Sequence, residues 1–300
     1  MRAHDFTLRQ LQYAVAVADT GGFHRAAERC RVAQPSLSMQ VAQLERALGV
    51  RLFERGPGGV MVTAAGAELL ERARVLLTSA NDLAQAAQRF GDPMAGTLRI
   101  GVIPTVAPYL LPAVAPALRA AHPRLDLRWV EQKTESLMAE LTAGRLDAAM
   151  LAGIPEGEAF AHAVLGDDPF VLAGPVGHPL LQSDEPLRLD ALRGERVLLL
   201  DDGHCLRDQA LALCASAGAD EARFRATSLA TLTQMVAGGA GVTLLPVLAL
   251  AVENRFGALA VRSFAEPGPS RTLVLAWRKA SPIGAELRAL AAGVREAMPG

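Results

Sequence analysis

The sequence predicts a mixed protein: an all-α N-terminal segment with a small β-wing, one long helix, and an α/β region. Three observations predict it. Apolar residues repeat at helical spacing through the N-terminal part, with one alternating stretch around a Gly/Pro turn. Residues 64–90 keep helical spacing with few breakers for longer than an average helix. From residue 96 onward, short aliphatic strands alternate with amphipathic helices, the pattern of α/β layers.

The N-terminal segment predicts three helices and a hairpin. Residues 7–19 place apolar side chains at helical spacing, and a glycine pair ends that pattern. Residues 23–30 and 33–49 predict two short helices joined by a tight turn, which is typical of a helix-turn-helix. Residues 50–63 alternate around a Gly/Pro turn, which predicts a small β-wing.

The rest of the chain predicts seven strands and five helices. We expect strands at 97–103, 125–131, 147–152, 169–174, 196–201, 242–245 and 272–277. Helices are expected at 106–121, 134–143, 206–217, 228–238 and 283–297. We therefore predict three parts: an N-terminal domain at 1–64, a linker and dimerisation helix at 65–92, and a larger domain of two α/β subdomains at 93–300.

Composition narrows the class of protein. At 300 residues, 51% hydrophobic content and a mean hydropathy of +0.22, the chain has enough apolar side chains for two or three packed domains. No apolar run reaches the length of a membrane span, and the first residues lack the apolar core of a signal peptide. We expect a cytoplasmic protein with no membrane partner, which disfavours a solute-binding transport protein. Residues 1–64 carry a formal charge of +3 and the remainder −4, which fits an N-terminus facing nucleic acid.

Three cysteines are too few for a disulfide scaffold. Cys30 lies between two arginines at the end of a predicted helix, where we expect a small packing residue. Cys205 and Cys214 stand nine residues apart without a CxxC pair and with only His204 nearby, so a metal site is disfavoured and no cofactor is expected.

Cys205 and Cys214 occupy different positions in the predicted structure. Cys205 stands where a strand turns into a helix, and the N-terminus of a helix favours a thiolate, although three nearby aspartates oppose it. Cys214 continues an apolar helix face, so inert packing remains open for it. Nine residues of helix span about 13.5 Å, whereas a disulfide needs Cα atoms within about 7 Å. A disulfide between them would therefore require the helix to unwind in part.

The stretch "RAAERCRVAQPSLSMQVAQLERALGVRLFER", followed by "VTAAG", resembles the winged helix-turn-helix of LysR-type transcriptional regulators. The resemblance implies a regulator rather than an enzyme, with two α/β subdomains of the periplasmic-binding-protein type around an effector cleft. It also implies a dimer of dimers that binds double-stranded promoter DNA and changes recruitment of RNA polymerase. On the recognition helix and wing, the residues expected to contact DNA are Gln34, Pro35, Ser36, Ser38, Gln40 and Arg55.

Further segments, "GVIPTVAPYLLP", "DDGHCLRDQALALC" and "AGADEARFRATSLATLTQMVAGGAGVTLLP", resemble the hydrogen-peroxide-sensing members of that family. The resemblance implies that Cys205 reacts with peroxide, that Cys214 then forms a disulfide with it, and that glutaredoxin or thioredoxin reduces the bond. It implies activation of antioxidant genes and a role for Phe224 in assembly. The candidate peroxide pocket comprises Thr105, Thr134, His204, Arg207, Asp208 and Arg271.

Simpler interpretations of these residues remain open. Thr105 and Thr134 could cap helices, Arg207 and Asp208 could lie on a solvated helix face, and Arg271 could be an exposed charge at a strand edge. Two other functions also compete: a metabolite-responsive regulator with structural thiols, and a thiol peroxidase.

Overall fold

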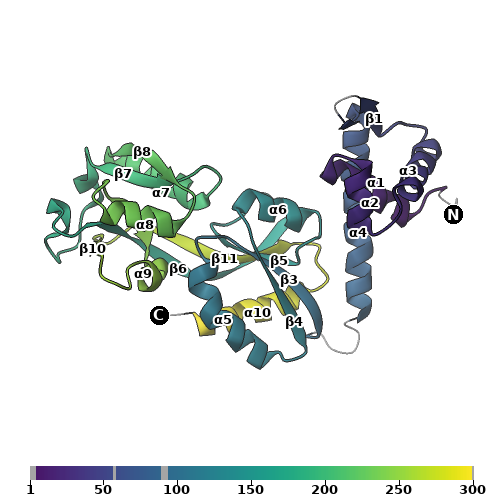
Figure 1. The fold of residues 1–300 in the computed structure, drawn as a ribbon. Coiled ribbons are helices and arrows are strands. Elements are labelled where there is room, and N and C mark those ends of the chain that lie inside the picture. Colours follow the sequence, from purple (N-terminus) through teal and green to yellow (C-terminus); the bar gives the residue numbers. More distant parts are fainter. Residues whose placement is uncertain (1–4, 57–58, 89–93, 299–300) are drawn as a thin grey trace. The chain divides into compact units, whose positions relative to one another are not determined.

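A computed structural model describes residues 5–56, 59–88 and 94–298 (Figure 1). The chain divides into two compact units, Met1–Ala87 and Gln88–Gly300. Each unit has a hydrophobic core of its own, and the second has two. The predicted order of an α-helical segment with a wing, a long helix and an α/β region is confirmed. Among the residues that the structure describes, no helix combines the length and apolarity that a membrane crossing needs.

The first unit is the predicted winged helix-turn-helix. Its elements are α1 (Leu8–Thr20), α2 (Phe23–Cys30), α3 (Gln34–Leu48), β1 (Phe53–Gly56), β2 (Gly59–Val62) and α4 (Ala64–Gln88). Thr7 and Gln10 form a capping box that fixes the start of α1. Leu37, Val41 and Leu44 of α3 are buried, as their spacing predicts. The predicted long helix at 64–90 is present as α4, and the last two of those positions lie outside the described residues.

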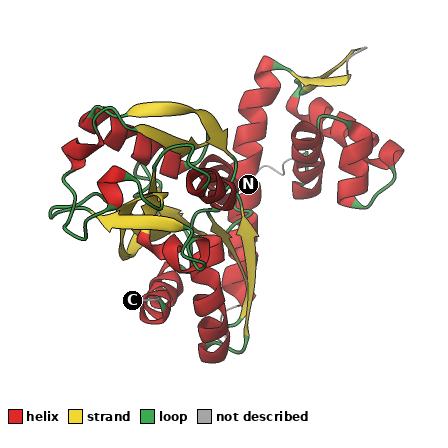
Figure 2. Ribbon diagram, turned by 60° about the vertical axis from the view of Figure 1, so that its left-hand side comes forward, coloured by secondary structure: helices red, strands yellow, loops and turns green. Residues whose placement is uncertain are grey.

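The second unit is built on a mixed seven-stranded sheet. Its first half contains β3 (Gly96–Val102), α5 (Ala107–Ala121), β4 (Leu125–Glu131), α6 (Thr134–Thr142), β5 (Ala148–Ala152) and β6 (Phe160–Pro175). Three strands from later in the chain, β9 (Thr243–Pro246), β10 (Leu259–Ser263) and β11 (Ser270–Arg278), complete the sheet. The strand order is β10-β6-β11-β5-β3-β4, with β9 also paired to β6. β3 is parallel to both β4 and β5, whereas β11 is antiparallel to β5 and β6. Figures 1 and 2 show α5 and α10 (Gly284–Ala297) on one face of this sheet, and α6 lies on the other.

The long strand β6 joins two subdomains, because its first half pairs with β11 and its second half pairs with β9 and β10. The second subdomain contains η1 (Pro179–Leu181), η2 (Leu189–Leu192), β7 (Arg196–Leu200), α7 (Cys205–Ala217), β8 (Asp220–Ala226), α8 (Leu229–Ala237), β9 (Thr243–Pro246), α9 (Val247–Glu253) and β10 (Leu259–Ser263). Within this subdomain, β7 and β8 form a parallel pair that is separate from the seven-stranded sheet. One apolar core lies under β3, β5 and β11, and the other lies among β7, β9, α7 and α8.

The structure differs from the sequence prediction where strands are polar. β6 begins nine residues before the predicted 169–174, because its first half buries only Leu165 and Asp168 and lacks a continuous apolar run. β8 and β10 were not predicted, since both are edge strands, each with a single buried residue and no continuous apolar run. Their pairing comes from long-range contacts rather than from local apolar spacing.

Candidate functional site

Three parallel strands end at one edge of the large sheet. Thr105 follows β3, the pair Lys133-Thr134 follows β4, and Gly153 follows β5. The carboxyl ends of parallel strands are where open α/β sheets bind ligands. This edge of the sheet is therefore the candidate binding site of the second unit.

The N-terminus of α7 lies against this edge, although the rest of α7 belongs to the other subdomain. Cys205, the first residue of α7, is half-buried and packs against the core under β3 and β5. Gln209, one turn further on, donates a hydrogen bond from Nε2 to the carbonyl oxygen of Ala152 at 2.8 Å. Lys133 Nζ donates to the carbonyl oxygen of Asp202 at 2.7 Å. Cys205 is thus held in the boundary between the two subdomains.

Three buried polar atoms, on the start of α7 and on the turn after β4 that bonds to Asp202, have no hydrogen-bond partner among the described residues. They are Thr134 Oγ1, His204 Nε2 and Gln209 Oε1. Such atoms are rare in folded proteins because each costs the free energy of its lost hydration. A small polar molecule with several donors and acceptors would satisfy them. The helix-capping interpretation of Thr134 is wrong, since Lys133 is the N-cap of α6 and no side chain caps that helix.

His204 is buried, with 4% of its surface exposed, and immediately precedes α7. Burial lowers its pKa, and the nearby Lys133 ammonium lowers it further, outweighing the opposing effect of Asp201. The imidazole is therefore neutral at pH 7. A neutral imidazole carries one N–H donor and one acceptor nitrogen, and both suit a small polar ligand.

The two thiols of α7 have opposite surroundings. Cys214 is 1% exposed within the second core, and burial raises its pKa to about 11. At pH 7 a thiol with that pKa is ionised in roughly one molecule in ten thousand. Cys205 lies at the helix N-terminus, where free backbone amides stabilise a negative charge. Both are free thiols in one continuous helix, so the rise of nine residues keeps them about 13.5 Å apart.

Arg271 is buried rather than exposed at a strand edge, so that simpler interpretation is wrong. Its guanidinium donates to Asp168 Oδ2, Thr105 Oγ1 and the Thr105 carbonyl oxygen, each at 2.9 Å. Asp168 lies opposite Arg271 in the β6–β11 register and also accepts the backbone N–H of Leu248 in the first turn of α9. Thr105 does not cap α5, whose N-cap is Val106 without a side-chain hydrogen bond. Arg271 thus fixes the loop after β3.

Arg207 and Asp208 lie on different sides of α7. Arg207 is buried, so a solvated helix face is the wrong interpretation for it, and its guanidinium donates to Asp202, Glu221 and the Leu200 carbonyl oxygen. Asp208 is exposed, in keeping with a solvated face. Phe224 lies on the edge strand β8 with 37% of its surface exposed.

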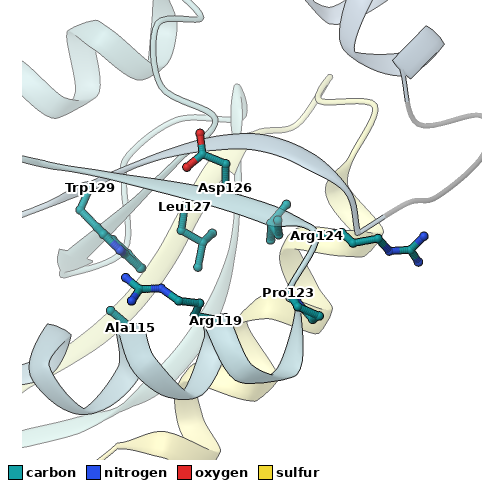
Figure 3. Close-up of a pocket in the computed structure, with 8 residues that line it drawn as sticks. Ala115, Arg119, Pro123, Arg124, Asp126, Leu127 and Trp129 are labelled. Carbon is teal, nitrogen blue, oxygen red and sulfur yellow. The ribbon is translucent and has the colours of Figure 1, made fainter.

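A cavity of about 360 Å³ lies away from the thiols, between the C-terminal part of α5 and the start of β4 (Figure 3). Figure 3 shows Arg119 and Trp129 directed into this cavity, whereas Arg124 extends away from it. It is at the opposite end of β4 from the Lys133-Thr134 turn. Its residues therefore contribute nothing to the surroundings of Cys205.

The candidate nucleic-acid interface is the start of α3. Pro35 and Ser36 are exposed in its first turn, while Gln34, Ser38 and Gln40 are half-buried. The backbone of Arg55 lies in β1 of the wing, and its side chain is outside the described part of the structure. Glu45 fixes the wing to α3, because its Oε1 accepts the backbone N–H groups of Leu52 and Phe53 at 2.7 and 3.2 Å. Cys30 is half-buried, and burial raises its pKa despite the nearby Arg29.

Two protein-family models match this chain, one over the helix-turn-helix unit and one over the α/β unit. The family model described as the bacterial regulatory helix-turn-helix protein, lysR family, matches residues 8–67, and the LysR substrate binding domain matches residues 91–299. The chain belongs to the LysR family of regulators. As a LysR-family member it is a transcription regulator rather than an enzyme.

Within the LysR family, relatives of the OxyR type match nearly the whole chain. A "Hydrogen peroxide-inducible genes activator" from Dickeya chrysanthemi is 46% identical over 97% of this chain and 95% of its own length. A full-length OxyR cysteine-to-aspartate variant from Pseudomonas aeruginosa has a TM-score of 0.79 and 35% identity, covering 98% of this chain and 96% of that one. A peroxide-bound cysteine-to-serine OxyR variant from Corynebacterium glutamicum has a TM-score of 0.66 and 35% identity, covering 99% and 95%.

Four residues that pair with the candidate residues or hold α7 in place were missed by the sequence prediction. Gln209 follows Cys205 by one helical turn, so its position on the same helix face was a usable signal. Lys133 directly precedes a predicted helix start, which gave a weaker signal. Asp168 and Glu221 gave no signal in the sequence, since Asp168 meets Arg271 and Glu221 meets Arg207 only through the tertiary fold.

Proposed function

We propose that this LysR-family regulator senses hydrogen peroxide through Cys205 and responds by forming a disulfide between Cys205 and Cys214. The observation that carries the proposal is the surroundings of Cys205. It is a helix N-terminal thiol at the carboxyl ends of three parallel strands, beside buried polar atoms without partners. The peroxide-bound Corynebacterium relative supports the choice of ligand.

The proposed chemistry has two steps. The Cys205 thiolate attacks one oxygen of the peroxide, the O–O bond breaks, and the leaving hydroxide takes a proton to become water. The product is a sulfenic acid on Cys205. The Cys214 sulfur then attacks that sulfenic sulfur, so that an S–S bond forms, the S–O bond breaks and a second water leaves. Glutaredoxin or thioredoxin would return the two electrons by thiol exchange.

The difference between the thiols supports this order of events. Burial raises the pKa of Cys214 to about 11, so this thiol is protonated while α7 is intact. A protonated thiol is a poor nucleophile. Cys205 is therefore the first to react, and Cys214 acts only after the N-terminal part of α7 has opened and brought the Cys205 sulfur to it.

The proposed pocket residues contribute in two ways. Thr134 and His204 offer buried polar atoms without partners, and the Thr105 hydroxyl accepts from Arg271 while keeping its own proton to donate. Arg271 orients Thr105 rather than meeting the peroxide directly. Asp208 is the outermost of the proposed set, and Arg207, whose hydrogen bonds go to Asp202, Glu221 and the Leu200 carbonyl oxygen, positions α7 rather than meeting the peroxide.

For the output, we propose binding to promoter DNA through the start of α3 and the wing. The family match to the helix-turn-helix region supports this. The contacting residues would be Gln34, Pro35, Ser36, Ser38, Gln40 and Arg55. In the cytoplasm, a dimer of dimers joined through α4 and contacts that include Phe224 would re-space its DNA-binding units on oxidation, recruit RNA polymerase and activate antioxidant genes.

The test is a peroxide titration of the full-length protein, followed by mass spectrometry of both thiols. One equivalent of peroxide should give the Cys205 to Cys214 disulfide in the wild type. In Cys214→Ser the reaction should stop at a sulfenic acid on Cys205, and Cys205→Ser should show neither product. Unmodified thiols in the wild type at a few equivalents of peroxide would overturn the proposal and favour the competing metabolite-responsive regulator with structural thiols.

A further inference from the structure

Four charged side chains form a closed ring at the start of α7. The charge ring consists of Asp202, Arg207, Glu221 and Arg225. Arg207 donates to Asp202 Oδ1 at 2.8 Å and to both oxygens of Glu221 at 2.9 and 3.2 Å. Arg225 donates to Asp202 Oδ2 at 3.0 Å and to Glu221 Oε1 at 3.1 Å. Each carboxylate thus bridges both guanidinium groups.

Arg207 is the buried member of the charge ring. Its side chain is 6% exposed, compared with 25% for Glu221, 44% for Arg225 and 72% for Asp202. It also donates to the carbonyl oxygen of Leu200 at the end of β7, at 3.2 Å. A buried guanidinium is costly unless its donors are paired. The ring therefore stabilises the one conformation of α7 in which Arg207 meets β7 and β8 together.

That conformation is the one in which Cys205 and Cys214 are apart. Arg207 is only two residues from Cys205 and lies in the same helical turn. Closing a gap of about 13.5 Å to disulfide distance requires the N-terminal part of α7 to unwind or move. Cys214 at the other end is fixed within the second core. The segment that moves is therefore the one carrying Arg207, and its bonds to Glu221 must break.

We infer that the charge ring, through the Arg207–Glu221 pair, sets how readily Cys205 reaches Cys214, which makes Glu221 and Arg225 positioning residues for disulfide formation. This inference rests on the proposed function. The ring stabilises the dithiol form over the disulfide form. Weakening the ring shifts the equilibrium toward the disulfide and speeds its formation from the sulfenic acid. Since none of its hydrogen bonds reaches Cys205, the reaction with peroxide keeps its rate.

The first test compares Glu221→Gln with the wild type and with a matched control, Glu140→Gln. Glu140 on α6 is held by Arg145 in the same two-bonded geometry, at 2.6 and 2.8 Å, and is 30% exposed, but it has no contact with α7 among the described hydrogen bonds. The thiol–disulfide equilibrium of each full-length protein is measured in dithiothreitol buffers by mass spectrometry. We expect Glu221→Gln to favour the disulfide by about tenfold, a potential about 30 mV more negative. Glu140→Gln should match the wild type within about twofold.

Rates give an independent readout. After a single addition of peroxide, the sulfenic acid should convert to the disulfide up to about tenfold faster in Glu221→Gln. Formation of the sulfenic acid, measured in a Cys214→Ser background, should stay within about twofold. Arg225→Gln should also favour the disulfide and speed its formation from the sulfenic acid, but by less than Glu221→Gln does. If Glu221→Gln fails to fold, the Arg225→Gln result tests the inference in its place. Higher ionic strength should shift the wild type toward the disulfide more than it shifts Glu221→Gln.

The outcomes separate this inference from the proposed function. If the wild type forms no disulfide, the proposed function fails and the inference with it. If the wild type forms one and the Glu221, Arg225 and Glu140 variants all behave alike, the inference alone is overturned. A change in sulfenic acid formation as large as the change in its conversion would also overturn it, because the ring would then act on Cys205 itself.

Discussion

Replacing Asp168 with Ala should destabilise the second unit strongly, because it leaves the buried charge of Arg271 without its partner. The Arg271 side chain is 0% exposed and Asp168 is 3% exposed, so water cannot replace the lost carboxylate. The Arg271 Nε hydrogen bond and one backbone N–H of α9 lose their acceptor, and Arg271 loses its ion-pair partner. Removing one partner of a buried pair costs about 3–5 kcal/mol. With a slope of about 3 kcal/mol per molar urea, the midpoint of unfolding should fall by more than about 1 M.

Tryptophan fluorescence is the appropriate assay, since both tryptophans, Trp129 and Trp277, lie in the second unit and the signal reports that unit alone. Asp167→Ala is the matched control, because Asp167 is exposed on the same strand and accepts only the Thr272 hydroxyl among the described contacts. It should cost less than about 1 kcal/mol. The double variant Asp168→Ala, Arg271→Met should recover part of the loss, as it removes the stranded charge. Equal midpoints for the Asp167 and Asp168 variants would refute the reasoning.

Three further predictions follow from single contacts. Gln209→Ala removes the bond from α7 to the end of β5 and should lower the free energy of unfolding of the second unit by about 1 kcal/mol, measured in the same urea assay; an unchanged midpoint contradicts it. Because burial lowers the pKa of His204, the folded protein binds fewer protons than the unfolded chain, so stability falls as the pH drops below about 6.5 toward that lowered value. His204→Gln should show a smaller fall between pH 7.5 and 5.5, and equal slopes would count against this. Glu45→Ala frees the wing from α3 and should weaken binding to promoter DNA by about tenfold in fluorescence anisotropy, whereas the exposed Glu54→Ala should not.

Local patterns in the sequence were sufficient to predict the helices and strands that bury one continuous apolar face. The apolar spacing of α3 predicts that Leu37, Val41 and Leu44 are buried, and the strand-to-helix transition places Cys205 at a helix N-terminus; both features are present. These features depend on neighbours within one or two turns. The spacing argument for Cys214 likewise needs only the continuity of one helix, which α7 has.

Charged residues in the second unit could not be placed in this way. The local sequence of Arg271 leaves an exposed strand edge open, yet Arg271 is buried because Asp168, 103 residues earlier, lies opposite it in the sheet. The local sequence of Arg207 leaves a solvated helix face open, yet Glu221 on an unpredicted edge strand covers it. In both cases strand pairing brings in the carboxylate that compensates the buried guanidinium. Strand pairing leaves no local pattern in a single sequence.

The position of α7 explains why a disulfide, rather than the sulfenic acid alone, would change the protein's shape. Cys205 contacts the core under β3 and β5, whereas Cys214 lies inside the core of the other subdomain. A sulfenic acid adds one oxygen to a side chain that is already half-buried, and α7 keeps its bonds to Ala152 and Glu221. A disulfide instead draws Cys205 away from the first core, so the contacts at the subdomain boundary must rearrange with it. On the proposed function, disulfide formation rather than sulfenic acid formation would remove the boundary contacts, and Cys214→Ser should separate the detection of peroxide from the structural response.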